Sequence, residues 1–476
     1  MKFIDRKGEL RELKGMEALS RKKLFVMALY GLRRVGKTRL LLEFIKGRGM
    51  YFFVNKNKTS ADLLLEYQGM LRSEGMLGEL EVLESWDRFV EIIIRRNPSV
   101  MVFDEFQNFL FVEPAMFGML QKGMDLNESR PGMIILSGSL IGLMKRTFQD
   151  SKEPLYGRIK KGKKLEPLPL DSCLQVGKEL RLAKEDVIKL YGIFGGYPKY
   201  YVAMEDFALH GKTAEAAMET LIFAKDAPLE DEVIGILSQE FGARSGVYYS
   251  ILEAIGCGNT SVSAIAGYMR MPVTSLTRQI NELKDYFEMI EYELPYRGKR
   301  GAYRIRHPLL AFWFTHIHRR YSDYASRNQD FMDSLRENLN AMFGKTFEGA
   351  AKEFLVSKLK LTDARRQWGR IQDAGKGKDT YEIDLIGSGK FSQKFFSQGK
   401  SDLPCKDRKK AIYAFEFKWK DLDAKEALAI IQNLQEKVKN VHPLPAALRY
   451  GIVARKIRNR DKVRAAGHLA YDIGDF

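Results

Sequence analysis

The chain has 476 residues, with 78 lysines and arginines against 61 aspartates and glutamates, and a formal net charge of +17. A hydrophobic content of 45% with 11% aromatic residues excludes a largely disordered chain, and the length predicts about three domains. The basic excess favours an anionic partner, most simply nucleic acid, although a generally basic protein would have the same composition.

The three cysteines, Cys173, Cys257 and Cys405, lie far apart and form no CxxC pair. This spacing predicts neither a disulfide framework nor a zinc site. The first residues contain no apolar signal core, and no uncharged run reaches the ~18 residues that a membrane helix needs. We therefore expect a cytoplasmic protein that has no membrane partner.

Short apolar runs alternate with amphipathic segments through the first third of the chain. This pattern places consecutive strands in one sheet, so it predicts a parallel sheet wrapped by helices. The predicted strands cover residues 24–30, 50–54, 99–103 and 133–136, and a helix over 37–45 follows a glycine-rich turn.

From about residue 171 the pattern becomes helical and more polar. Helices are predicted over 213–224, 248–270 and 272–286, the last of them entered through a proline. Two short runs at 288–295 and 302–306 predict a β-hairpin with a basic tip, and a polar stretch at 321–331 marks a boundary. The final part mixes a helix over 344–358 with strands at 380–386 and 411–419.

The glycine-rich turn fits the pattern GxxxxGK[ST], which binds the phosphates of a nucleotide. Glycines let backbone N–H groups turn toward phosphate oxygens, and the following helix points its positive end at the same charge. We expect Lys37 to reach the β- and γ-phosphates of ATP and Thr38 to hold Mg²⁺. The predicted nucleotide-binding residues are Gly31, Leu32, Arg33, Arg34, Val35, Gly36, Lys37, Thr38 and Arg39.

A second apolar strand ends in two carboxylates, Asp104 and Glu105. Downstream of such a loop, Asp104 would hold Mg²⁺ and Glu105 would polarise the attacking water. A further strand ends at Ser139, which can place a hydroxyl near the γ-phosphate, although a plain strand-to-loop turn has the same sequence. Together these residues predict an ATP-hydrolysing site.

Several of these segments resemble the archaeal-type AAA+ ATPases. The resemblance implies that residues 3–10 lie near the adenine, that Ser139 is a sensor, and that Arg158 senses the γ-phosphate. Arg158 could instead be an ordinary surface arginine. The GGxP-like residues 195–199 could instead be an ordinary break between helices. The segments that carry the resemblance are residues 3–10, 31–38, 103–105, 136–139, 154–158 and 195–199.

Residues 261–268, a short turn and residues 272–286 fit helix-turn-helix spacing, and the basic hairpin follows as in a winged helix. In a DNA-binding winged helix the second helix enters the major groove and the hairpin touches phosphate. A winged helix that contacts only protein is the alternative. The residues expected at DNA are Thr274, Ser275, Thr277, Arg278, Arg297, Lys299 and Arg300.

Two apolar strands near the C-terminus carry charge at alternating positions. Glu416 and Lys418 share a face of their strand, which is costly in a buried strand that has no use for them. Asp384 on the neighbouring predicted strand could join them. Two carboxylates that bind Mg²⁺ beside a lysine form an arrangement that cleaves phosphodiesters.

The same residues resemble the PD-(D/E)xK nuclease fold. The resemblance implies that Glu348, Asp384 and Glu416 are metal ligands and that Lys418 is the catalytic lysine. The long basic stretch at 391–410 departs from the family pattern. A solvated charged face is the alternative for this cluster, and a solvated basic helix for the basic run at 455–464.

These interpretations predict an α/β chain of four parts: a P-loop AAA+ ATPase core (1–170), a helical lid (171–240), a winged-helix domain (241–325) and a restriction-endonuclease-like α/β domain (326–476). The leading hypothesis is an ATP- and Mg²⁺-dependent ATPase that binds double-stranded DNA, cleaves it, and self-associates through its ATPase domain. The alternatives are a nucleotide-controlled switch and a DNA-binding regulator, each with an inactive nuclease-like domain.

Overall fold

The computed structural model describes residues 3–96, 100–242, 245–371, 380–389, 411–443 and 448–476. The chain divides into two compact units. Unit 1 comprises residues 1–168, 197–199 and 281–288, and unit 2 comprises residues 169–196, 200–280 and 289–476. Cys405, the basic stretch at 391–410 and the first residue of the strand predicted at 99–103 lie outside the described residues.

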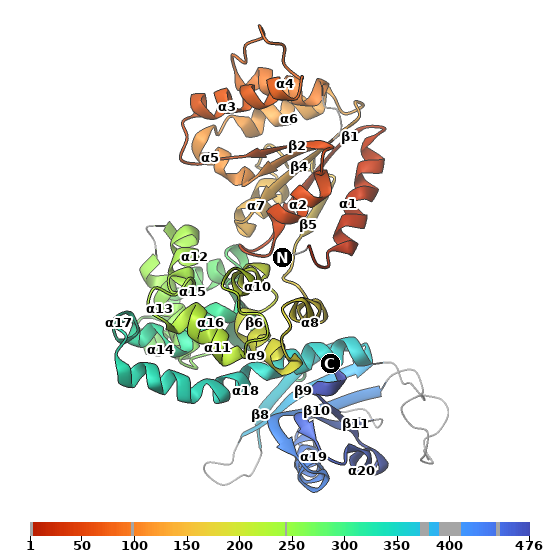
Figure 1. The fold of residues 1–476 in the computed structure, drawn as a ribbon, viewed down its shortest axis with the longest axis vertical. Helices are drawn as coiled ribbons and strands as arrows, with labels where there is room; N and C mark the ends of the chain where they lie inside the picture. Colours follow the sequence, from red (N-terminus) through yellow and green to blue (C-terminus); the bar gives the residue numbers. More distant parts are fainter. Residues whose placement is uncertain (1–2, 97–99, 243–244, 372–379, 390–410, 444–447) are drawn as a thin grey trace. The chain divides into compact units, whose positions relative to one another are not determined.

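A five-stranded sheet forms the centre of unit 1 (Figure 1). Every neighbouring pair of strands is parallel, so the predicted parallel sheet is confirmed. The short edge strand was not predicted, because three of its four residues are lysines and only pairing with its neighbour holds it extended. In spatial order the strands are β2 (Gly49–Phe53), β3 (Val100–Asp104), β4 (Gly132–Gly138), β1 (Leu24–Tyr30) and β5 (Lys161–Lys164).

An aromatic core joins this sheet to the helices that follow its strands. Phe52 on β2 stacks on Phe103 of β3 with ring centroids 5.1 Å apart, and Phe89 meets both rings edge-on. Each ring is almost fully buried, which contributes about 1.5–3 kcal/mol per side chain. The helices of unit 1 are α1 (Lys7–Ser20), α2 (Lys37–Ile45), α3 (Ser60–Ser73), α4 (Trp86–Arg95), α5 (Phe109–Val112), α6 (Met116–Leu126) and α7 (Ile141–Gln149).

Unit 2 begins with helices, as the polar periodicity after residue 171 predicts. The segment expected as one helix over 248–270 is divided in two, because Gly258 adopts a φ of +89° between the halves. These helices are α8 (Leu170–Glu179), α9 (Lys184–Phe194), α10 (Pro198–Asp206), α11 (Ala214–Met218), α12 (Glu232–Phe241), α13 (Ser245–Gly256), α14 (Val262–Met269), α15 (Val273–Asn281), α16 (Pro308–His316) and α17 (Tyr321–Ala325).

The predicted helix over 272–286 forms as α15 and continues as one π-helical turn, Glu282–Tyr286. The predicted hairpin is confirmed: β6 (Ile290–Glu293) pairs antiparallel with β7 (Ala302–Ile305). The 31-residue helix α18 (Gln329–Leu359) contains the predicted helix over 344–358 as its second half. The Asn328 side chain caps α18 by accepting from Phe331 N, so the expected boundary at 325/326 falls in the turn before α18.

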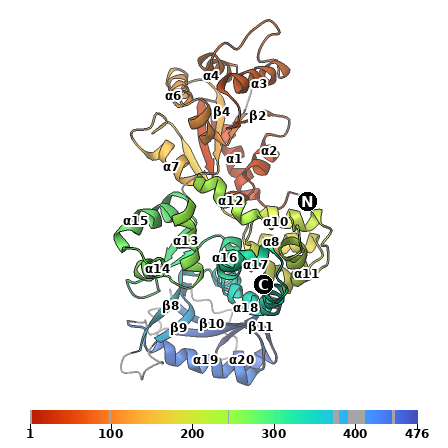
Figure 2. The same ribbon diagram turned by 90° about the vertical axis from the view of Figure 1, so that its left-hand side faces the viewer.

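A second five-stranded sheet closes the chain. Parallel pairs join β10 to β11 and β11 to β12, whereas β9 pairs antiparallel with both β8 and β10. Figure 2 shows α19 (Ala424–Val438) and α20 (Arg460–Ala465) on the side of this sheet opposite α18. In spatial order the strands are β12 (Leu469–Asp472), β11 (Leu448–Ile457), β10 (Ala411–Leu422), β9 (Thr380–Gly389) and β8 (Thr362–Arg370).

Helices α8 and α9, which lie in the segment expected to form a lid, belong to the same core as this second sheet. Leu170 and Ile188 are buried in one apolar cluster with Phe347 on α18 and with Leu385 and Phe415 on the strands. The segments expected at 171–240 and 326–476 therefore pack together inside unit 2. Among the described helices, none has the length and hydropathy that would let it span a bilayer.

Candidate functional site

The phosphate-loop motif connects β1 to α2 in unit 1, and its shape depends on two glycines. A Cβ on Gly31 would lie 2.4 Å from the backbone oxygen of Leu165, so only glycine fits there. Gly36 takes a φ of +91° immediately before α2. Within the predicted nucleotide-binding set, Gly31, Val35 and Lys37 are buried, Leu32, Arg33 and Gly36 are half-buried, and Arg34, Thr38 and Arg39 are exposed.

Lys37 points back into this loop. Its Nζ donates to the carbonyl oxygens of Gly31, at 2.8 Å, and of Leu32, at 3.1 Å. No side chain caps the N-terminus of α2, so its first N–H groups suit an anionic ligand. A buried lysine and an uncapped helix start at one glycine-rich loop together fit a polyphosphate.

Two candidate Mg²⁺ ligands lie in direct contact. Thr38 Oγ1 donates to Asp104 Oδ2 at 2.6 Å, and the hydroxyl of Tyr51 donates to the same oxygen at 2.8 Å. Burial, with a further contribution from Asp104, raises the pKa of Tyr51, so the phenol stays protonated and remains a donor. Hard oxygen ligands of this kind fit Mg²⁺. Tyr51 lies on a predicted strand. It reaches Asp104 only because β2 is the neighbour of β3 in the sheet, and the sequence pattern does not predict that order of strands.

The candidate catalytic carboxylate, Glu105, is also held by two donors. Ser139 Oγ donates to Glu105 Oε2 at 2.7 Å, and Gln107 Nε2 donates to the same oxygen. Gln107 lies on the 3₁₀-helix η1 (Phe106–Asn108), and a Cβ on Gly138 would lie 2.4 Å from its Oε1. The structure therefore brings Glu105 and Ser139, two of the predicted site residues, into contact. The structure also places Gln107 at this carboxylate. In the sequence, only its position two residues after Glu105 could have indicated this contact.

The N-terminal segment at 3–10 reaches the same loop. Arg6 is buried, and its Nη2 donates to the backbone oxygens of Val35, at 3.1 Å, and of Glu166, at 2.8 Å. Residues 197–199 of the GGxP-like segment also belong to unit 1, and a Cβ on Gly36 would lie 3.6 Å from the ring of Pro198. These two segments, which are among those that carry the AAA+ resemblance, therefore adjoin the loop.

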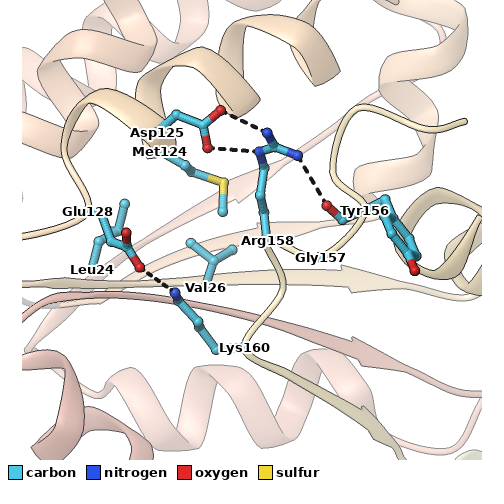
Figure 3. Close-up of a pocket in the computed structure, with 9 residues that line it drawn as sticks. All are labelled: Leu24, Val26, Met124, Asp125, Glu128, Tyr156, Gly157, Arg158 and Lys160. Carbon is cyan, nitrogen blue, oxygen red and sulfur yellow. Dashed lines mark hydrogen bonds and ion pairs between the residues drawn. The ribbon is translucent and has the colours of Figure 1, made fainter. Parts of the chain in front are cut away.

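Arg158 lies elsewhere in unit 1, in a pocket of about 440 Å³ (Figure 3). Its guanidinium donates to both carboxylate oxygens of Asp125, at 2.8 and 2.9 Å, and this contact lowers the pKa of Asp125. The pocket includes Leu24 and Val26 at the start of β1, whereas the phosphate loop follows the end of β1. Since seven residues of strand span about 20 Å, the structure does not bring Arg158 to Lys37 of the same chain.

Residues 3–204 match the model of an ATPase domain found predominantly in Archaea. This part of the chain is therefore similar to that family of ATPase domains. The whole chain is 26% identical over 482 residues to the uncharacterized protein MJECL04 of Methanocaldococcus jannaschii, and the match covers 100% of both.

Two solved structures are also similar to this chain. The Walker-type ATPase PABY2304 of Pyrococcus abyssi has a TM-score of 0.52 at 22% identity, over 66% of this chain and 96% of that one. The ORC2 protein of Aeropyrum pernix has a TM-score of 0.48 at 12% identity, over 71% of this chain and 96% of that one. The likeness to PABY2304 shows a shared P-loop ATPase fold.

The C-terminal charged residues also converge, in unit 2. Lys418 Nζ lies 2.9 Å from Glu416 Oε2 and 3.9 Å from Asp384 Oδ2, and Phe417 N donates to that same aspartate oxygen at 2.6 Å. The Glu416 side chain is only 4% exposed, and Lys437 Nζ on α19 donates to its other oxygen at 2.6 Å. The sequence interpretation placed three of these residues together and missed Lys437, which reaches the cluster because α19 runs back along the sheet.

Electrostatic coupling links the three predicted carboxylate ligands. Burial, followed by the charge of Glu416, raises the pKa of Asp384 to about 7. Burial also raises the pKa of Glu348, while Arg366 opposes that shift from 3.8 Å away. A cation between such carboxylates reduces their mutual repulsion and favours their ionised forms.

The cluster fits a divalent cation in its chemistry. The described residues contain no group of three acidic, histidine or cysteine side chains arranged to hold a metal ion. Lys418 lies beside both carboxylates of the Asp384–Glu416 pair. Mg²⁺ commonly takes one or two protein carboxylates and completes its shell with water and substrate phosphate oxygens, so the number of carboxylates in this pair fits Mg²⁺.

The residues expected at DNA are accessible in the structure. Leu276 and Ile280 anchor the buried face of α15. The hairpin loop between β6 and β7 is exposed from Arg297 to Arg300. The exposed positions include Thr274, Ser275, Thr277, Arg278, Arg297, Lys299 and Arg300.

Proposed function

We propose that the chain is an ATP-hydrolysing AAA+-type protein that binds double-stranded DNA and cleaves it with a Mg²⁺-dependent PD-(D/E)xK-like domain at its C-terminal end. One observation carries the proposal: Asp384, Glu416 and Lys418 meet from two adjacent strands, with Lys418 Nζ 3.9 and 2.9 Å from the two carboxylates. This cluster belongs to a chain that also has an archaeal-type ATPase domain.

At the nucleotide site, Lys37 exchanges the carbonyl oxygens of its own loop for oxygens of the β- and γ-phosphates. Mg²⁺ held by Thr38 and Asp104 would neutralise part of the phosphate charge. Glu105 orients the attacking water and accepts its proton once its Oε2 leaves the two donors that hold it. Ser139 then has its hydroxyl available for the γ-phosphate.

At the C-terminal cluster, a Mg²⁺ ion would polarise the scissile phosphate. Asp384 and Glu416 would supply its oxygen ligands, and Glu348 would be the third carboxylate of the site. Lys418 keeps its ammonium beside the phosphate and stabilises the negative charge that develops there. Lys437 positions Glu416 through the oxygen that does not face Lys418.

Two further assignments belong to this proposal. The exposed start of α15 and the basic hairpin provide the DNA-binding surface, which agrees with the net charge of +17. Arg158 senses the γ-phosphate of a second copy of the chain, since it lies at the end of β1 opposite its own phosphate loop. Self-association through the ATPase domain would release it from Asp125.

Incubation of the full chain with plasmid DNA and Mg²⁺, with and without ATP, tests the nuclease assignment. We expect Asp384→Ala and Lys418→Ala to lose at least a hundredfold in cleavage rate, since each removes a group that acts on the phosphate. Lys420→Ala is the matched control, because that lysine is exposed two residues further along β10. If the wild-type chain cuts no DNA under any condition, the nuclease assignment fails.

The same samples distinguish the second candidate function, a nucleotide-controlled switch with an inactive nuclease-like domain. That function is favoured by the absence of a three-ligand metal group among the described residues. ATP turnover without any DNA cleavage would support the switch. Turnover and cleavage together, with cleavage alone lost in Lys418→Ala, would reject it.

A further inference from the structure

The hairpin between β6 and β7 is fastened to the C-terminal sheet within unit 2. Tyr296 N donates to the backbone oxygen of Arg366 on β8 at 2.9 Å, and Arg297 N donates to Gln367 Oε1 at 2.7 Å. On the strand that leads into the loop, Glu293 forms an ion pair with Lys352 of α18 at 3.6 Å. The hairpin is therefore held by a strand and a helix of the nuclease-like domain.

Gln367 is built into this attachment. Its side chain is buried, and its Nε2 donates to the backbone oxygen of Trp368, at 3.0 Å, and to the Tyr381 hydroxyl, at 3.1 Å. Its Oε1 is thereby turned toward Arg297 N of the hairpin. Since a buried polar group left without a partner is unfavourable, this glutamine favours the docked hairpin over a free one.

The attachment lies next to the cluster of carboxylates. Gln367 pairs with Ile383, the residue before Asp384, and the Arg366 side chain lies 3.8 Å from Glu348. Neighbouring strands are about 4.8 Å apart, so the hairpin backbone at Arg297 lies on the order of 10 Å from the Asp384 backbone. Beyond that point the loop presents three exposed cations, Arg297, Lys299 and Arg300.

We propose that the hairpin tip and the Asp384–Glu416–Lys418 cluster form one surface, on which a single nucleic-acid strand contacts both. The inference rests on the proposed nuclease function, and it adds where on the strand the hairpin binds relative to the bond that is cut. Successive phosphates of one strand advance about 3.4 Å along the duplex axis, so a duplex whose axis follows the line from the cluster to the hairpin places about three phosphates in about 10 Å. The tip therefore grips a phosphate about three nucleotides from the bond that the cluster cuts, and in this way selects which bond is cut.

Neutral linkages test this spacing without any knowledge of the DNA sequence that the chain prefers. A duplex carries one methylphosphonate linkage in an otherwise ordinary strand, and the cuts made by the full chain with Mg²⁺ are mapped relative to that linkage. We expect cutting to fall roughly tenfold at the bond about three nucleotides from the neutral linkage, because a charge-assisted hydrogen bond is lost there. Cutting should also fall at the neutral linkage itself.

Three variants assign the effect to the tip. The triple change Arg297→Ala, Lys299→Ala and Arg300→Ala should abolish the depletion at three nucleotides and leave the depletion at the cut bond. Gln367→Met keeps the cations but loosens the attachment, so it should spread the depletion over several positions. Lys462→Ala is the control, because this exposed lysine on α20 lies toward the β12 edge, four strands and about 19 Å from β8.

The outcomes distinguish a failure of the shared surface from a failure of the proposed nuclease function. If the wild-type chain cuts DNA but shows no depletion about three nucleotides away, or if the triple variant keeps that depletion, the shared surface is refuted and the nuclease stands. If the wild-type chain cuts nothing, the proposed nuclease function fails and the shared surface fails with it.

Discussion

Lys437 offers a test of the C-terminal cluster that requires no activity. Its ammonium lies 2.6 Å from one oxygen of Glu416, whose other oxygen is 2.9 Å from Lys418. Removing one partner of a buried ion pair costs about 3–5 kcal/mol when nothing replaces it. Because Lys437 is 31% exposed and Lys418 remains, we discount this value and expect Lys437→Met to lower the unfolding free energy of unit 2 by about 1–3 kcal/mol.

Urea unfolding followed by tryptophan fluorescence measures this loss, since Trp313, Trp368 and Trp419 lie in unit 2 and only Trp86 lies in unit 1. A divalent cation should recover the loss, because it replaces the missing positive charge between the carboxylates. Mg²⁺ at a hundred times its dissociation constant would add about 2.7 kcal/mol. The gain on adding Mg²⁺ should therefore be larger in Lys437→Met than in the wild-type chain.

The matched control is Lys439→Met, two residues further along. That lysine is 68% exposed and pairs with Glu436 at the surface, so its loss should change the unfolding free energy by no more than about 0.5 kcal/mol. The account of the cluster is refuted if both variants lose the same stability. It is also refuted if Mg²⁺ stabilises neither the Lys437→Met variant nor the wild-type chain.

Three more predictions concern the rest of the chain. Gly31→Ala forces a Cβ to 2.4 Å from a backbone oxygen and should weaken ATP binding at least tenfold by calorimetry, whereas Gly15→Ala, with open space around it on α1, should not. Tyr51→Phe removes a donor to Asp104 and should raise the Mg²⁺ concentration for half-maximal ATP turnover about tenfold; an unchanged Mg²⁺ dependence would contradict this. Burial lowers the pKa of His307 to about 3 in the folded chain. Between pH 6.5 and 3 the unfolded chain therefore binds a proton at this histidine that the folded chain does not bind. The unfolding free energy of the wild-type chain should then fall by up to about 1.4 kcal/mol per pH unit from pH 6.5 toward pH 3, and it should fall less steeply in His307→Asn. Equal pH slopes in the two chains would refute this role of His307.

The elements that sequence patterning predicts correctly are those whose own residues determine their structure. The continuous apolar run of β1 and the glycines of the loop after it specify a buried strand and a phosphate turn locally. By contrast, β5 consists of lysines and one glycine and is a strand only because β1 offers an edge. The polar stretch at 321–331, predicted only as a boundary, contains the short helix α17 and the first three residues of α18.

The candidate sites divide in the same way. Thr38 and Asp104 follow from motifs that sit directly after strands, and the structure places their side chains in direct contact. The three residues that sequence reasoning missed, Tyr51, Gln107 and Lys437, reach their sites through tertiary placement, namely the order of β2 and β3, a single 3₁₀ turn and the return of α19. Motif spacing along one chain carries no information of that kind.

Calorimetric titration of the full chain with ATP and Mg²⁺ tests the central claim most directly. We predict uptake of one nucleotide per chain. Lys37→Ala should weaken it at least tenfold, because it removes the ammonium that faces the phosphates. Lys46→Ala, an exposed lysine immediately after α2, should bind ATP as the wild-type chain does. An absence of heat in the wild-type chain, or equal affinities in wild type and Lys37→Ala, would contradict the nucleotide site.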